Sequence, residues 1–120
     1  MPLRDTLNDI VQSVDGALAS IIMGYDGIPI EEVALKQSDF DIQLMSVEYS
    51  SVLKEIKRTI EIIRAGDMEE VSITTGQTFV VMRVLGNELF IALIIRRTGN
   101  FGKGRYMLKC KSKELMRELE

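Results

Sequence analysis

The sequence predicts an α+β domain built on an antiparallel sheet, and three observations lead to that fold class. Apolar residues recur at intervals of three and four in three segments, which indicates amphipathic helices near both ends and in the middle of the chain. Five short β-type runs lie between these segments, and most of them are joined by tight turns. The last run, residues 89–95, is apolar at every position, so we expect a central strand with helices over both sheet faces.

Length and composition indicate one folded domain that covers residues 1–120. The chain is 46% hydrophobic and 28% charged, a composition typical of globular proteins. The single cysteine, Cys110, excludes an intramolecular disulfide and fits a reducing compartment. No apolar run reaches the roughly 18 residues that a bilayer span needs, and residues 1–5 lack the layout of a signal peptide. We therefore expect a cytoplasmic protein without stable membrane insertion.

The first elements are predicted to be a helix and a hairpin. Apolar residues at helical spacing mark the helix, which is expected to end near Gly16: Leu3, Leu7, Ile10, Val11 and Val14. Residues 17–24 and 28–34 are predicted strands, and the Asp26-Gly27 pair between them favours a tight hairpin turn. Pro29 removes a backbone donor from the return strand, which predicts a position at the sheet edge.

Residues 41–65 form the longest segment with one unbroken helical period, after a short polar connection over residues 36–40. Asp39 or Asp41 is the expected N-cap, and Gly66 is expected to end the helix. The predicted core face consists of seven apolar residues: Ile42, Met45, Tyr49, Val52, Ile56, Ile60 and Ile63. Further apolar and small residues lie off this face and indicate a second contact surface: Leu44, Val47, Ile62, Ser46, Ser50 and Ser51.

The second half of the chain is predicted to contain three strands and a final helix. The strands cover residues 68–75, 78–85 and 88–97, with turns at Thr75-Gly76-Gln77 and Gly86-Asn87. Residues 99–102 break the last strand and open the helix. Its apolar residues, Phe101, Leu108, Leu115 and Leu119, hold a period close to that of an α-helix.

The residue types present argue against an enzyme. The chain has no histidine, which removes the commonest general base and metal ligand. A single cysteine cannot form a structural zinc site, and no phosphate-binding loop motif is present. We predict no catalytic residues, no metal and no cofactor. Residues 96–120 hold eight basic and three acidic side chains, but their regular spacing is typical of a solvated helix, so we do not expect nucleic-acid binding.

The order of elements and several local strings resemble the Roadblock / dynein light-chain family, whose bacterial and archaeal branch includes the MglB-type regulators of Ras-like GTPases. The likeness runs over nearly the whole chain, and no single string is diagnostic. The strings that carry it are Val14-Asp15-Gly16-Ala17, Ile21-Ile22-Met23-Gly24-Tyr25-Asp26-Gly27-Ile28-Pro29-Ile30, Glu69-Glu70-Val71-Ser72-Ile73-Thr74-Thr75-Gly76, and Asn100-Phe101-Gly102 with Arg105.

The resemblance implies a profilin-like Roadblock fold, a five-stranded antiparallel sheet with the long helix on one face and the two terminal helices on the other. It also implies a homodimer in which the third strand pairs with its symmetry mate and the long helices lie side by side. The implied dimer interface is Glu70, Val71, Ser72, Ile73 and Thr74 with Leu44, Val47, Ser50 and Ser51. The residues that contact an MglA-type GTPase are not carried over from the family; we expect them on the outer side of residues 44–58, at Leu44, Val47, Glu48, Ser51, Lys54, Glu55 and Arg58.

Three functions therefore remain open from the sequence. The leading hypothesis is a non-catalytic homodimeric regulator of a Ras-like small GTPase, of the GTPase-activating type. The alternative is a scaffold or adaptor subunit like dynein light chains, without effect on GTP hydrolysis. A small-ligand sensor domain is the third hypothesis.

Overall fold

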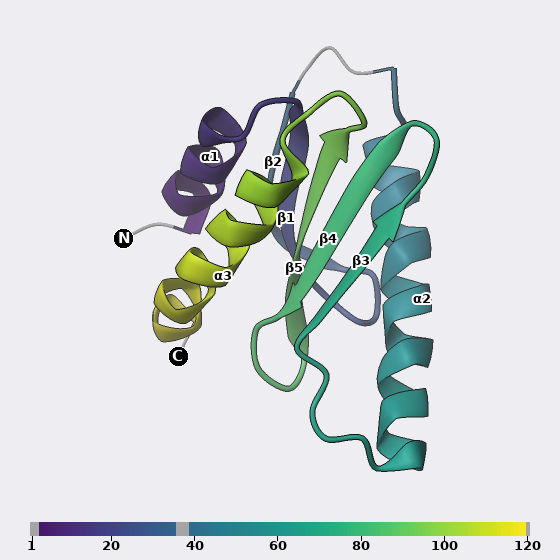
Figure 1. Cartoon of the computed structure of the whole chain (residues 1–120). Coiled ribbons are helices and arrows are strands. Elements are labelled where there is room, and N and C mark those ends of the chain that lie inside the picture. Colours follow the sequence, from purple (N-terminus) through teal and green to yellow (C-terminus); the bar gives the residue numbers. More distant parts are fainter. Residues whose placement is uncertain (1–2, 36–38, 120) are drawn as a thin grey trace.

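Five antiparallel strands form one sheet in the order β2-β1-β5-β4-β3 (Figure 1). The structure is a computed structural model that describes residues 3–35 and 39–119. Residues 1–2, 36–38 and 120 lie outside the described residues, and residues 36–38 belong to the predicted polar connection. The strands are β1 (Ala17–Gly24), β2 (Pro29–Ala34), β3 (Glu70–Thr74), β4 (Thr78–Val84) and β5 (Leu89–Arg96).

Three helices cover the two faces of this sheet. Helices α1 (Leu3–Ser13) and α3 (Phe101–Glu118) lie side by side on one face, and α2 (Ile42–Ile63) lies on the other (Figure 1). The fold class predicted from the sequence, with its arrangement of helices, is therefore confirmed.

Strand β5 lies at the centre of the sheet and separates two hydrophobic clusters. Ile91, Leu93 and Ile95 face the cluster under α1 and α3, whereas Phe90 and Ile94 face the cluster under α2. Successive side chains of a strand point to opposite faces, so a strand covered on both sides needs apolar residues at every position. The prediction of a central strand at residues 89–95 is confirmed.

Helix α2 begins as predicted but differs at its end and in its buried face. The Asp41 side chain accepts a hydrogen bond of 3.0 Å from the Leu44 amide and so caps the first turn. The helix ends at Ile63, and its left-handed cap is Arg64 (φ 54°), two residues before the predicted terminator Gly66. The predicted core face is wrong at two positions, because Val52 and Ile63 are exposed.

The deeply buried residues of α2 are Ile42, Ser46, Ser50 and Leu53. Met45, Tyr49, Ile56 and Ile60 pack beside them and are partly buried. Spacings of four, four and three place the buried four on one narrow line of the helix. Because two of them are serines, this line gave no hydrophobic signal in the sequence.

The loop between α1 and β1 contacts the loop that follows β5, and the two loops meet at Gly16 and Gly99. A Cβ atom on Gly99 would clash with the Asp15 carbonyl oxygen and would lie only 3.0 Å from the Gly16 Cα. These are backbone atoms, so they cannot rotate away as a side chain does. The Asn100 amide also donates to the same Asp15 carbonyl, which fixes the two loops together.

We expect Gly99→Ala to lower the free energy of unfolding by about 2–3 kcal/mol, within the range of overpacked sites. Urea unfolding followed by circular dichroism measures this loss. The matched control is Gly76→Ala in the β3–β4 turn, where a Cβ meets nothing within 4 Å. There alanine reduces the entropy of the unfolded chain, so stability should stay equal or rise by up to about 1 kcal/mol. Equal losses at both glycines would contradict the close loop contact.

Candidate partner-binding surface

The outward face of α2 carries the largest group of exposed apolar side chains on any helix of the described residues. Leu44 is 58% exposed, and Ile62 and Ile63 are each 64% exposed. Val47 and Val52 are also exposed. A soluble protein rarely leaves such side chains grouped on one element without a partner. This helix is therefore the first candidate for a protein-binding surface.

All seven residues predicted to face a GTPase are exposed on this helix. They are Leu44, Val47, Glu48, Ser51, Lys54, Glu55 and Arg58. Arg58 and Glu55 approach each other at 3.7 Å across one helical turn, and both side chains remain solvated. An exposed pair of this kind adds little to stability. The surface thus combines apolar side chains with charges that are accessible to a partner. We call these seven residues the outer face of α2.

One residue predicted for the dimer interface is buried inside the protomer. Ser50 is only 2% exposed, and its hydroxyl donates to the Val47 carbonyl at 2.7 Å. The hydroxyl lies against Gly27 in the β1–β2 turn, where an added Cβ would be 3.4 Å from it. The small side chain lets α2 approach the hairpin, so the predicted interface role of Ser50 is wrong. Ser46, another of the small residues assigned to a second surface, is buried as well.

The positions of Val47 and Val52 distinguish two sides of α2. Val47 lies beside Gly27, on the side of the β1–β2 hairpin. Val52 follows by five residues, which turns it roughly 140° around the helix axis. Val52 lines a shallow, mostly apolar groove together with Ile56 and Thr59. The groove lies on the side of the helix that faces away from the hairpin.

Strand β3 is the second candidate surface, because it forms an open edge of the sheet. The strand pairs only with β4 in the described chain. Val71 and Ile73 pack against the α2 side of the core, whereas Ser72 and Thr74 are exposed. An unpaired edge presents free amide and carbonyl groups to a further strand.

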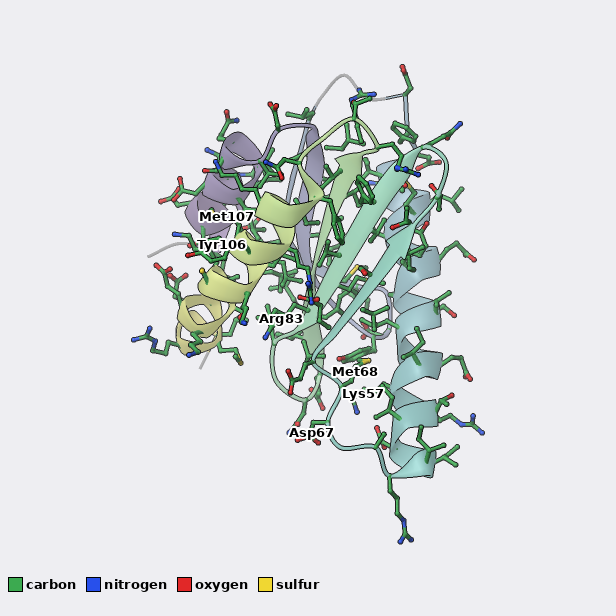
Figure 2. The ribbon with its side chains drawn as sticks, in the orientation of Figure 1. Lys57, Asp67, Met68, Arg83, Tyr106 and Met107 are labelled. Carbon is green, nitrogen blue, oxygen red and sulfur yellow. The ribbon has the colours of Figure 1, made fainter. Side chains whose placement is uncertain are left out.

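Glu70 ties this edge strand to the helix on the opposite face from α2. Its carboxylate lies 3.1 Å from an Arg83 nitrogen on β4 and 2.5 Å from the Arg105 Nε on α3. Figure 2 shows Arg83 between the sheet and α3. The Glu70 side chain is therefore engaged within the protomer, and only its backbone is available at the edge.

The described residues contain no arrangement typical of an active site. No group of three or more histidine, cysteine, aspartate or glutamate side chains in residues 3–35 and 39–119 could hold a metal ion. One cavity of about 380 Å³ lies between α2 and the following loop, with Lys57, Asp67 and Met68 in its wall (Figure 2). Lys57 is bound to Glu61 at 2.8 Å. Its ammonium also lies 5.8 Å from the centre of the Tyr25 ring.

Burial raises the pKa of the Tyr25 hydroxyl, although the nearby Lys57 charge partly opposes that effect. Tyrosine in this state stays protonated at neutral pH and offers no base. Within the described part of the chain, no helix is long and apolar enough to cross a membrane. Taken together, the exposed helix and the open strand make protein binding the chemistry that this molecule supports.

Comparison with solved structures identifies the class of protein. MglC from Myxococcus xanthus is 34% identical, with 98% of this chain and 99% of that chain covered and a TM-score of 0.73. A Roadblock/LC7 domain from Streptomyces avermitilis is 16% identical over 99% and 98% of the two chains, with a TM-score of 0.83. MglB from Myxococcus xanthus is 14% identical over 97% and 93%, with a TM-score of 0.81. A scan against family models and a search of curated proteins gave no match.

The chain belongs to the Roadblock/LC7 family. Within that family, the MglC match over the full length places it with the Mgl proteins, which confirms the branch predicted from the residues. Profilin IB from Acanthamoeba castellanii also matches, with 10% identity and a TM-score of 0.65, so the fold is profilin-like as expected.

Proposed function

We propose that this protein is a non-catalytic, homodimeric regulator of a Ras-like small GTPase of the MglA type, and that it stimulates GTP hydrolysis in the cytoplasm. The observation that carries the proposal is the exposed outer face of α2, with its apolar and charged side chains, together with the open edge of β3. Family membership supports it as well, because MglB-type members act on such GTPases. The described residues offer no catalytic group, so the effect rests on binding.

The proposed dimer joins two β3 strands, residues Glu70 to Thr74, into one continuous sheet. A two-fold axis makes such a contact self-complementary. The two α2 helices then lie side by side, with Leu44 and Ser51 near the seam. We assign Val52 and the shallow groove around it to the helix contact, because they lie away from the hairpin. Val47 lies on the hairpin side, so we assign it to the surface for the GTPase.

The proposed action on the GTPase is positional. The outer face of α2 would hold the switch loops of the GTPase in the conformation that orients its own catalytic groups. Arg58 is the exposed arginine at the C-terminal end of this face, and it already lies close to Glu55. We therefore expect the apolar contacts, rather than an inserted arginine, to supply most of the effect.

Single-turnover GTP hydrolysis by the cognate GTPase tests this proposal. An excess of the protein should raise the rate at least about tenfold, which corresponds to roughly 1.4 kcal/mol of barrier. Val47→Asp should abolish most of this increase, since it places a charge within a contact that excludes water. Ile30→Asp is the matched control, because Ile30 is similarly exposed but lies on β2 at the other sheet edge. A rate that Val47→Asp leaves unchanged would contradict the proposed surface.

A second candidate function is a scaffold or adaptor subunit without effect on hydrolysis. The observation that favours it is a further exposed apolar group at the β2 edge, formed by Ile28, Ile30 and Leu35. Two separate apolar surfaces would allow a protein to hold two partners at once. The same assay separates the functions, because a scaffold binds the GTPase in a nucleotide-dependent manner while its hydrolysis rate stays constant.

A further inference from the structure

The outward face of α3 carries only positive charge. Its exposed charged residues are Lys103, Arg105, Lys109, Lys113 and Arg117, and Tyr106 and Cys110 are the exposed uncharged side chains between them. The two glutamates of the helix, Glu114 and Glu118, are half-buried at its side. The whole protein has a net charge of −3, so this concentration of cations does not follow from composition.

Most of these cations have no partner within the protomer. In residues 3–35 and 39–119, Lys103, Lys109, Lys113 and Arg117 form no ion pair, and Arg105 binds Glu70 through its Nε. On other elements, basic side chains do pair with acidic ones. For example, Arg4 on α1 lies 3.0 Å from Glu31 on β2. Unpaired like charges on one helix repel each other and lower its stability slightly. Apart from Arg105, these cations on α3 form no ion pairs within the described part of the protomer, so they are available to an acidic partner.

The spacing of the row suits a narrow partner. Arg105, Lys109, Lys113 and Arg117 follow at intervals of four residues, so they rise by about 6 Å at each step along the helix. A shallow cavity of about 420 Å³ lies beside the row, between α3 and the end of β3. Phe101 and Tyr106 form part of its wall. Tyr106, labelled in Figure 2, is 64% exposed. Aromatic side chains next to cations are typical anchors of protein interfaces.

We propose that the outward face of α3 binds an acidic segment of a partner protein, about one helix wide, which pairs with the cation row and places an apolar side chain beside Tyr106. The negative charges on the neighbouring helix α1 argue against a broad anionic surface, such as a lipid bilayer, as the partner. The exposed residues of α1 include Asp5 and Asp9, and α1 lies directly beside α3 (Figure 1). A bilayer would meet both helices and be repelled by α1. A single segment along α3 meets mostly cations; of the two glutamates in the cavity wall, Glu69 and Glu70, the second is already bound by Arg83 and Arg105.

This surface lies on the sheet face opposite α2, so the proposal does not depend on the proposed GTPase contact. Binding is measured by fluorescence anisotropy with a labelled helical peptide that has glutamate at every fourth position and one central leucine. We expect saturable binding that weakens as NaCl rises from about 50 to 300 mM, because exposed charges are screened. Backbone amide chemical shifts of the native protein should change in residues 103–117 and around Arg83. Shifts confined to α2 or β2 would overturn the proposal.

The variant Lys109→Glu with Lys113→Glu should weaken peptide binding by about ten- to a hundredfold. The matched control, Lys54→Glu with Arg58→Glu, changes the net charge equally but on α2, and it should bind the peptide like the native protein. Conversely, the α3 variant should stimulate GTP hydrolysis normally, which separates a failure here from a failure of the proposed function. Absence of saturable peptide binding overturns the proposal. Tighter binding to phosphatidylserine vesicles or to a single-stranded oligonucleotide than to the peptide does so too.

Discussion

Replacing Ser72 with proline is expected to dissociate the proposed homodimer while each protomer stays folded. Ser72 is the middle residue of β3 and lies opposite Val81 on β4. The neighbouring backbone hydrogen bonds show which amides point outward: the Thr75 amide donates to the Thr78 carbonyl, and the Val84 amide donates to the Glu69 carbonyl. Opposed residues of antiparallel strands alternate between bonded and non-bonded pairs. The Ser72 amide therefore points away from β4, toward the open edge.

Proline at this position removes the outward amide without breaking a bond to β4. Edge strands tolerate proline for this reason. In the dimer, however, the loss occurs twice by symmetry, and each lost donor leaves a carbonyl of the partner unpaired. At roughly 1–3 kcal/mol for each of the two sites, the dissociation constant should rise about thirtyfold or more.

Sedimentation velocity over a range of concentrations measures this change. Ser72→Ala is the matched control, because it keeps the amide and should remain dimeric. Circular dichroism should give the same secondary structure for both variants. A proline variant that remains as dimeric as the alanine control would show that the copies associate through another surface.

Phe90→Ala should cause the largest loss of stability. The ring is 1% exposed at the centre of the cluster under α2, and its centroid lies 5.4 Å from that of Tyr25. Removing a buried phenylalanine leaves a cavity that rigid neighbours on β1 and β4 fill poorly. We expect a loss of about 3–5 kcal/mol in the free energy of unfolding. The midpoint of thermal unfolding should fall by roughly 10–25 °C.

Phe79→Ala on the other sheet face is the control for this prediction. Phe79 is partly buried and packs on Phe101, with ring centroids 4.7 Å apart. Because Phe79 buries less apolar area than Phe90, we expect Phe79→Ala to lower the free energy of unfolding by about 1–2 kcal/mol. Calorimetry of both variants gives the comparison. Equal losses would indicate that the cluster under α2 is loosely packed around Phe90.

Much of the fold follows from local signals in the chain. Residues 89–95 are apolar throughout, which requires a strand covered on both faces, and β5 is that strand. Pro29 predicted an edge strand, and β2 lies at an edge. Asp41 provides the predicted cap of α2. These features depend on the residue itself or on its near neighbours, so the sequence contains them directly.

The candidate surface could be predicted only in part. The exposed positions Leu44, Val47 and Ile62 were found because they break the period of the helix. Val52 and Ile63 were missed, since an apolar residue within a helical period counts equally for core and surface. Their exposure depends on how α2 is rotated against the sheet, and in that rotation the line of Ile42, Ser46, Ser50 and Leu53 is the buried one.

By itself the sequence determined the class of elements, their order, the central strand and the absence of histidine chemistry, because each depends on residue type and period. Only the tertiary structure decided which side of α2 faces the solvent, that Glu70 binds Arg83 and Arg105, and that most exposed cations of α3 form no ion pair within the described residues. These features arise between segments far apart in sequence. Small residues such as Ser46 and Ser50 decide the contacts there, and no periodic pattern distinguishes a small residue that is buried from one that is exposed.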